Sequence, residues 1–233
     1  LIMGPGELPL LELARRMEAN GGAERLAGSP ERWLPLLHDI PGAVVRTASP
    51  DLQVSGVELP SHELVVADGK AMCEAFNLAE RNPRAVKIQR VGNTRVLVQP
   101  NFPEPASYRN LLNRIYLLPF TRLAHPMYGG ASIPALEQVR FSVTTHRGCY
   151  GGCAFCAITA NHGKRVICRD RASILAEVEA IAAHAQFRGT IPDIGGPTAN
   201  MWGTGCRRPD GDSCGRPSCL FPEICPHLET NQE

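Results

Sequence analysis

The sequence predicts an α/β protein, because segments with strand patterns alternate with segments with helical patterns along its 233 residues. Residues 1–22 have the pattern of a strand end, a glycine turn and a helix. Residues 85–100 have the pattern of two β runs around a turn. Residues 137–200 give a strand, a cysteine-rich loop, a helix and a second short strand.

Composition is typical of a globular protein, with 43% apolar residues to form a core and a formal net charge of +1. Acidic and basic residues are mixed, so no charge pattern indicates nucleic acid or an anionic membrane as a partner. No apolar run approaches the roughly 18 residues that a membrane span needs, and the start lacks the basic region of a secretory signal. We expect a soluble cytoplasmic protein. The start at Leu1 suggests a piece cut from a longer chain.

The first segment is expected to be the last βα unit of an α/β domain, with a tight turn at Gly4 and Gly6. Its helix ends at the glycine pair 21–22. The residues expected on its buried face are Leu10, Leu11, Ala14 and Met17. We place the end of this domain at residue 27, and a connecting α+β region at residues 28–135.

The connecting region begins with a proline-rich stretch, 29–60, which predicts irregular structure with two short strands. Residues 68–83 then predict a helix with one apolar stripe. The stripe consists of Met72, Cys73, Phe76 and Ala79. Cys73 is therefore expected to pack against the protein and not to bind a metal.

Two further elements follow in the connecting region. Residues 85–100 predict a β-hairpin that turns at Gly92 and Asn93. Residues 107–120 predict a helix, and a loop over 121–134 follows it. The residues expected to face inward from this helix are Leu111, Leu112, Ile115 and Leu118.

The last region, 136–233, opens with a predicted strand over 137–149 in which Val139, Phe141 and Val143 alternate. This strand leads directly into a cluster of cysteines. A helix over 169–187 is predicted next, with Asp170 as N-cap. Its apolar face is expected to contain Ile174, Val178 and Ile181. A second strand within 188–200 ends at Gly195 and Gly196, although Pro192 removes one ladder donor from it.

The cysteine cluster is the strongest functional signal in the chain. Eight of the nine cysteines follow residue 148, and the loop "HRGCYGGCAFCAI" holds Cys149, Cys153 and Cys156. Clustered cysteines in a reducing compartment indicate metal or redox chemistry more than disulfides. Three glycines, Gly148, Gly151 and Gly152, permit the positive φ values that would let the thiols converge.

Three kinds of site could use this loop. A thioredoxin-like pair would employ Cys153 and Cys156 and leave Cys149 without a role. A structural zinc site would need a fourth ligand, such as His146 or His162. A 4Fe-4S cluster held by only three thiolates would leave one iron open, which is what a catalytic metal requires.

The loop resembles the signature of the radical S-adenosylmethionine (SAM) superfamily, C-x3-C-x-aromatic-C, with Phe155 as the aromatic residue. The segments "HPMYGGASIPALEQVRFSVTTHRGCYGGCAFCAI", "DIGGPTAN" and "CLFPEICPHL" resemble the YgiQ-type radical SAM family. The resemblance implies an open (β/α) barrel of the TIM type after an α/β domain similar to cobalamin-binding modules. Such a barrel needs about six βα units, and the sequence supplies two of them, so the barrel would be truncated here.

The same resemblance implies how SAM is bound and used. The open iron would chelate the SAM methionine, Phe155 would lie against the adenine, and Gly195 and Gly196 would bind the methionine through the backbone. The acid that follows the glycines in the superfamily is missing, since Pro197 follows them here. A flavodoxin or ferredoxin would supply an electron, and SAM would be cleaved to methionine and a 5'-deoxyadenosyl radical that abstracts hydrogen from an unknown substrate.

A second cysteine group lies in a Gly/Pro-rich loop within residues 200–228. It consists of Cys206, Cys214, Cys219 and Cys225, with His227 as an alternative ligand. Four ligands without a vacancy fit a closed structural site, either zinc or a second iron-sulfur cluster, and the alternative is four free thiols. Cys168, between the two groups, is expected to be a buried thiol. The alternative to an enzyme is therefore a non-catalytic metal-binding or electron-transfer module with structural cysteine clusters.

Overall fold

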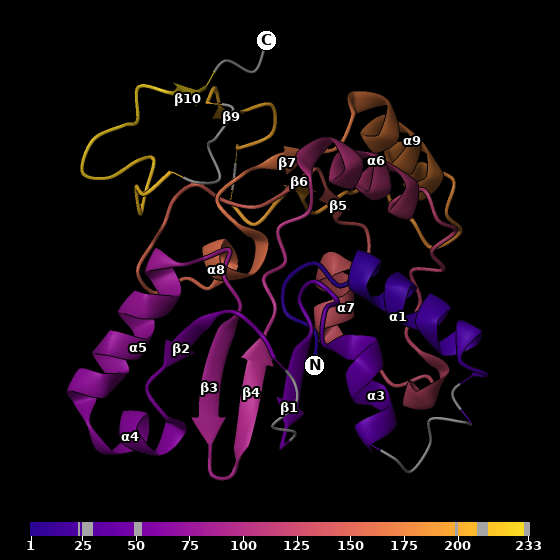
Figure 1. The fold of residues 1–233 in the computed structure, drawn as a ribbon. Helices are drawn as coiled ribbons and strands as arrows, with labels where there is room; N and C mark the ends of the chain where they lie inside the picture. Colours follow the sequence, from indigo (N-terminus) through magenta and orange to yellow (C-terminus); the bar gives the residue numbers. More distant parts are fainter. Residues whose placement is uncertain (23, 25–29, 49–52, 199, 209–213, 231–233) are drawn as a thin grey trace. The chain divides into compact units, whose positions relative to one another are not determined.

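The computed structural model describes residues 1–22, 24, 30–48, 53–198, 200–208 and 214–230, which form two compact units (Figure 1). The first unit contains Leu1–Phe102 together with Ala160–His162. The second contains Pro103–Thr159 and Gly163–Glu233. The two domain boundaries predicted from the sequence, after residues 27 and 135, stay predictions.

A four-stranded mixed sheet organises the first unit, in the order β1-β4-β3-β2 (Figure 1). Its strands are β1 (Val44–Thr47), β2 (Val57–Leu59), β3 (Lys87–Val91) and β4 (Thr94–Val98). The β3–β4 pair is antiparallel and turns at Gly92, whose φ of +58° suits glycine. The predicted hairpin is therefore confirmed, as are the two short strands expected within residues 29–60.

The described residues of the first unit include the helices α1 (Glu7–Ala19), α3 (Pro30–Leu37), α4 (His62–Ala67) and α5 (Gly69–Arg81). The stretch expected to be irregular thus contains one helix, α3. A small core of Ile40, Ala43 and Val45 packs against Leu13, Leu34 and Leu37. Side chains of Ser61 and Asp68 accept hydrogen bonds from backbone N–H groups at the starts of α4 and α5, which fixes where these helices begin.

The predicted apolar faces of α1 and α5 are wrong. Leu10 in α1 is 57% exposed, and Phe76 in α5 is 64% exposed. Cys73 is also exposed, so it does not pack as expected. Helix α5 instead buries Ala71, and a small side chain at this position allows the close approach of the helix to its neighbours α4 and β2.

The second unit combines short helices with three two-stranded sheets (Figure 1). Its helical elements are α6 (Pro105–Ile115), η1 (Pro126–Tyr128), α7 (Pro134–Val139) and α9 (Arg171–Ala182), and α8 (Ile158–His162) begins in it. Its strands are β5 (Val143–Thr144), β6 (His146–Arg147), β7 (Ile167–Cys168), β8 (Ile194–Gly195), β9 (Gly205–Cys206) and β10 (Leu228–Glu229). No helix among the described residues is long and apolar enough to cross a membrane.

Strands β5 and β8 form the parallel pair that a βα unit requires. The N–H of Val143 donates to the carbonyl oxygen of Asp193 at 2.9 Å, and the N–H of Thr145 donates to that of Gly195 at 2.6 Å. Helix α9 lies between the two strands in the sequence, as predicted. The described residues form a mixed α/β fold with small sheets and no closed barrel, so the partial TIM-type barrel remains a proposal.

Two predicted elements of the second unit are wrong in detail. The expected strand over 137–149 begins instead with the end of α7, and Val139 is 59% exposed. Pro134 in the first turn favours this helix because its fixed φ suits a helix start. Helix α6 ends at Ile115, which leaves Leu118 exposed. The predicted second short strand is confirmed as β8, which ends at the glycine pair.

A buried ion pair, which sequence reasoning missed, joins α9 to β5. The buried residues of α9 are Ser173, Glu177 and Ile181, in place of the expected face of Ile174, Val178 and Ile181. Arg169 is fully buried and forms an ion pair with Glu177, which also pairs with Arg122 at 2.5 Å. The Arg169 guanidinium donates to the carbonyl oxygen of Thr144 at 2.7 Å and lies over the ring of Tyr116.

Replacing Glu177 with alanine should destabilise the protein by about 3–5 kcal/mol, because it leaves the Arg169 charge buried without its carboxylate. Urea denaturation followed by circular dichroism measures this loss. Glu179→Ala, at an exposed position of the same helix, is the matched control and should change the free energy of unfolding by less than about 0.5 kcal/mol. Equal effects of the two substitutions would contradict the role given to the buried pair.

Candidate metal centre

The three-cysteine loop starts immediately after β6 and is shaped by glycine. Gly148 has a φ of +88°, and a Cβ at this position would lie 1.9 Å from the carbonyl oxygen of Arg165. Gly152 has a φ of +63°. Both positions therefore require glycine, as predicted. Gly151 lies outside the left-handed region, so the expectation of a positive φ there is wrong.

At Gly151 the reason for glycine is the proximity of two thiols. A Cβ on this residue would lie 3.3 Å from the Cys149 sulfur and 3.7 Å from the Cys153 sulfur. The N–H of Gly151 also points at the Cys149 sulfur, with a nitrogen-to-sulfur distance of 3.3 Å. Backbone N–H groups that donate to sulfur stabilise the thiolate form and tune iron-sulfur clusters. The donor set therefore suits a cluster ligated by thiolates.

The thiols of the loop differ in accessibility. Cys149 is 5% exposed, Cys156 is half-buried, and Cys153 is exposed. A turn links the last two, since the N–H of Cys156 donates to the carbonyl oxygen of Cys153 at 3.0 Å. Within the described residues, no three His, Cys, Asp or Glu side chains are gathered tightly enough to hold a single metal ion. All nine cysteines are described, and each has a free thiol.

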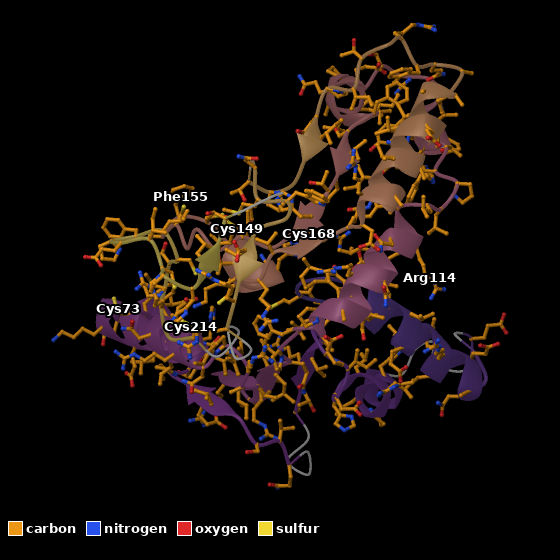
Figure 2. All side chains as sticks on the ribbon, turned by 90° about the horizontal axis from the view of Figure 1, so that it is seen from above. Cys73, Arg114, Cys149, Phe155, Cys168 and Cys214 are labelled. Carbon is orange, nitrogen blue, oxygen red and sulfur yellow. The ribbon has the colours of Figure 1, made fainter. Side chains whose placement is uncertain are left out.

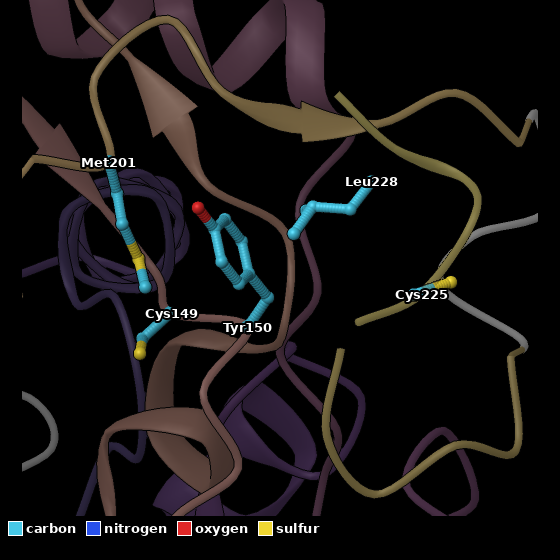
Figure 3. Packing of buried hydrophobic residues seen from close by; sticks show 5 residues of the cluster. All are labelled: Cys149, Tyr150, Met201, Cys225 and Leu228. Atoms are coloured by element: carbon cyan, nitrogen blue, oxygen red, sulfur yellow. The ribbon is translucent and has the colours of Figure 1, made fainter. Parts of the chain in front are cut away.

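One side of the loop is anchored in a hydrophobic core. Cys149 and Tyr150 pack with Met201, Cys225 and Leu228, and Figure 3 shows the ring of Tyr150 between the side chains of Met201 and Leu228. The other side faces solvent. Phe155, labelled in Figure 2, is 93% exposed, so its ring contributes little to the fold and is free for another contact.

The glycine pair predicted to bind SAM, Gly195 and Gly196, packs against a buried histidine that lies just before the cysteine loop. His146 is 1% exposed, and its Nδ1 lies 2.9 Å from the Thr145 hydroxyl. A Cβ on Gly196 would lie 2.5 Å from the His146 Nε2, so only glycine leaves room for the ring. Burial lowers the pKa of His146, which favours the neutral imidazole.

This placement bears on two sequence-based expectations. Because both ring nitrogens of His146 face Thr145 and Gly196, the structure does not direct this histidine to the three cysteines as a fourth zinc ligand. Gly196, predicted to bind SAM, has a packing role as well. At Gly195 a Cβ would lie 3.3 Å from the Asp193 carboxylate. The sequence gives no indication that His146 packs against Gly196, apart from the position of a histidine next to a buried strand.

The second cysteine group occupies the loop around β9 and β10. Cys206 is exposed, Cys214 and Cys219 are half-buried, and Cys225 is buried. The N–H of Cys225 donates to the carbonyl oxygen of Cys219 at 2.8 Å, and Cys206 lies opposite Leu228 in the β9–β10 pair. Burial raises the pKa of the Cys219 thiol, and charge on the other three cysteines raises it further. Cys219 is therefore within electrostatic range of the other three thiols.

Cys168 is half-buried, and its sulfur accepts a hydrogen bond from the N–H of Gly203 at 3.3 Å. Burial raises its pKa, so the neutral thiol is favoured. This environment is that of an inert packed thiol, in line with the expectation from sequence.

A double-mutant cycle tests the packing of Gly196 against His146. Gly196→Ala should destabilise the protein by about 1–3 kcal/mol, because its methyl group overlaps the imidazole. In a His146→Ala background the same substitution should cost less than about 0.5 kcal/mol, since the ring is gone. The free energies of unfolding of the four proteins, from urea denaturation, give the coupling. Additive effects would show that the two residues do not touch.

Comparison with known proteins places the chain in a family. A family profile described as "Radical SAM N-terminal" matches residues 1–142. A UPF0313 protein of Geobacter sulfurreducens is 44% identical over 241 residues, which covers 100% of this chain and 37% of that protein. A UPF0313 protein of Bacteroides thetaiotaomicron is 38% identical over 238 residues, or 99% of this chain and 38% of that protein.

The UPF0313 protein YgiQ of Escherichia coli is 41% identical over 183 residues, or 76% of this chain and 24% of that protein. The chain spans less than two fifths of the length of these curated relatives. No solved structure matches it. The chain therefore belongs to the Radical SAM N-terminal family, and the curated relatives it resembles, YgiQ among them, are UPF0313 proteins.

Proposed function

We propose that the protein is a radical SAM enzyme in which Cys149, Cys153 and Cys156 hold a 4Fe-4S cluster with one iron left open for SAM. The observation that carries this proposal is the arrangement at Gly151. Its N–H donates to the Cys149 sulfur, and the Cys153 sulfur lies against the same glycine. Family membership supports the proposal, because the radical SAM reaction uses this cofactor pair.

The residues of the chain have distinct parts in this function. Gly148 and Gly152 set the backbone so that the loop curls, and the Gly151 N–H stabilises the Cys149 thiolate. Gly195 and Gly196 would bind the SAM methionine through their backbone groups, since Pro197 cannot supply a carboxylate. The exposed ring of Phe155 would cover the adenine. In the whole protein these residues would lie at the carboxyl ends of the strands of a TIM-type barrel.

Cluster and SAM together supply the chemistry: one electron breaks a carbon–sulfur bond of SAM, giving methionine and a 5'-deoxyadenosyl radical that takes a hydrogen atom from the substrate. The electron comes from a low-potential donor of the flavodoxin or ferredoxin type. Nine free thiols fit a reducing compartment, which favours a cytoplasmic location. The substrate is an unidentified molecule with an abstractable hydrogen atom.

The second group, Cys206, Cys214, Cys219 and Cys225, forms part of the proposal as a closed metal site for zinc or a second iron-sulfur cluster. Its support is the close spacing of four cysteines in a Gly/Pro-rich loop, where Cys219 lies within electrostatic range of the other three. The alternative function is a non-catalytic metal-binding or electron-transfer module. It would hold metal at both groups but would leave no iron open for SAM.

Cys149→Ala should abolish the SAM-dependent change in the electron paramagnetic resonance (EPR) spectrum of the reduced, anaerobically reconstituted protein, because the cluster loses one of three ligands. Cys73→Ala is the matched control, since Cys73 is exposed on α5, and it should retain the full change. Iron, sulfide and zinc content per chain, measured on the same samples, identifies the metal at each cysteine group.

Two results would count against the proposal. If the EPR spectrum of the wild-type cluster does not change when SAM is added, the electron-transfer module is favoured. Equal SAM responses of Cys149→Ala and Cys73→Ala would show that the trio is not the ligand set.

A further inference from the structure

The two cysteine groups are joined by direct backbone contacts. The N–H of Cys219 donates to the carbonyl oxygen of Tyr150 at 3.0 Å. The hydroxyl of Ser218 donates to the carbonyl oxygen of Gly151 at 2.6 Å. Residues 217–219 of the second loop therefore pair with residues 150–152, the stretch between the first two predicted cluster ligands.

Ser218 is the centre of this contact. It is 5% exposed, and its oxygen also accepts hydrogen bonds from the N–H groups of Leu220 at 3.0 Å and Phe221 at 3.1 Å. One buried hydroxyl thus fixes the turn of its own loop and holds the carbonyl of the other. A buried hydroxyl with three partners is costly to remove, because the partners lose hydrogen bonds without access to water.

The contact is tight along its length. A Cβ on Gly152 would lie 2.1 Å from the carbonyl oxygen of Pro217, so the two backbones approach closely enough to exclude any side chain. On the neighbouring residue, the Tyr150 hydroxyl lies 3.1 Å from the hydroxyl of Thr204. The Lys164 ammonium group donates to the carbonyl oxygens of Cys214 and Arg216. The second loop therefore contacts both the first loop and the segment that follows α8.

We propose that residues 217–219 are a brace that positions the cluster-binding loop. Ser218 is a positioning residue, since it acts through Gly151 on the thiols beside it. Cys219 belongs both to the brace and to the second cysteine group. Its N–H donates to the carbonyl oxygen of Tyr150, and its own carbonyl oxygen accepts from the N–H of Cys225. The role of the brace in cluster binding rests on the proposed function. The brace itself rests only on the contacts between the two loops.

The physical consequence of the brace is preorganisation of the three-cysteine loop. A loop that is already held in its binding conformation loses less conformational entropy when it takes up a cluster. The brace would therefore favour cluster loading at the three cysteines.

The brace is tested in the metal-free protein by alkylation of cysteines with iodoacetamide, followed by mass spectrometry. Cys149 is nearly buried and Cys153 is exposed in the same loop, so Cys153 serves as an internal standard. Ser218→Ala should speed alkylation of Cys149 relative to Cys153 about tenfold, which corresponds to roughly 1.4 kcal/mol of easier local opening. Ser218→Thr keeps the hydroxyl and should restore most of the protection.

Two controls separate the brace from general destabilisation. Ser132→Ala, at an exposed position of the same unit, should alkylate like wild type. Gly152→Ala attacks the contact from the opposite loop and should expose Cys149, whereas Gly189→Ala, with a φ of +90° but no atom near the added Cβ, should not. Wild-type protection of Cys149 in both Ser218→Ala and Gly152→Ala would overturn the brace.

If the brace variants behave as expected but the wild-type EPR spectrum does not change when SAM is added, the proposed function fails while the brace stands.

Discussion

The constraint on which the site depends is the absence of a side chain at Gly151. Its bare backbone lets two sulfur atoms approach one peptide group, and its N–H is directed at the more deeply buried of them. A Cβ at this position would lie 3.3 Å from the Cys149 sulfur, close enough to crowd it. Gly148 and Gly152 serve the same end by accepting left-handed backbone next to neighbouring carbonyl groups. The cysteines supply the chemistry of the loop, and the glycines supply its shape.

The loop is held from two directions. On one side, the parallel pair β5–β8 brings the segment of Gly195 and Gly196 alongside the strand that leads into the loop, with His146 packed between them. On the other side, residues 217–219 pair with the loop itself. A region rich in Gly and Pro, which has little hydrophobic core of its own, is in this way part of the support of the candidate cluster site. The two cysteine groups form one structural neighbourhood in the second unit.

The features that the sequence predicted well are local ones. The hairpin at Gly92, the helix after Asp170 and the glycine-rich cysteine loop each depend on residues close together in the chain. The features it missed depend on distant partners. Ser218 acts on Gly151 across 67 residues, and Glu177 faces inward because Arg169 is buried beside it. The apolar stripe of α5 that contains Cys73 misled the prediction, because the helix packs through Ala71 instead. Periodicity gives the element, but tertiary packing decides its buried face.

The central claim is that three thiolates leave one iron of a cluster without a protein ligand. Mössbauer spectroscopy of protein reconstituted anaerobically with ⁵⁷Fe tests it most directly, because each iron of the cluster contributes to the spectrum. The account predicts that SAM changes the signal of one iron in four and leaves the other three nearly as they were. A spectrum that SAM leaves unchanged, or protein that takes up no cubic cluster at all, would contradict it.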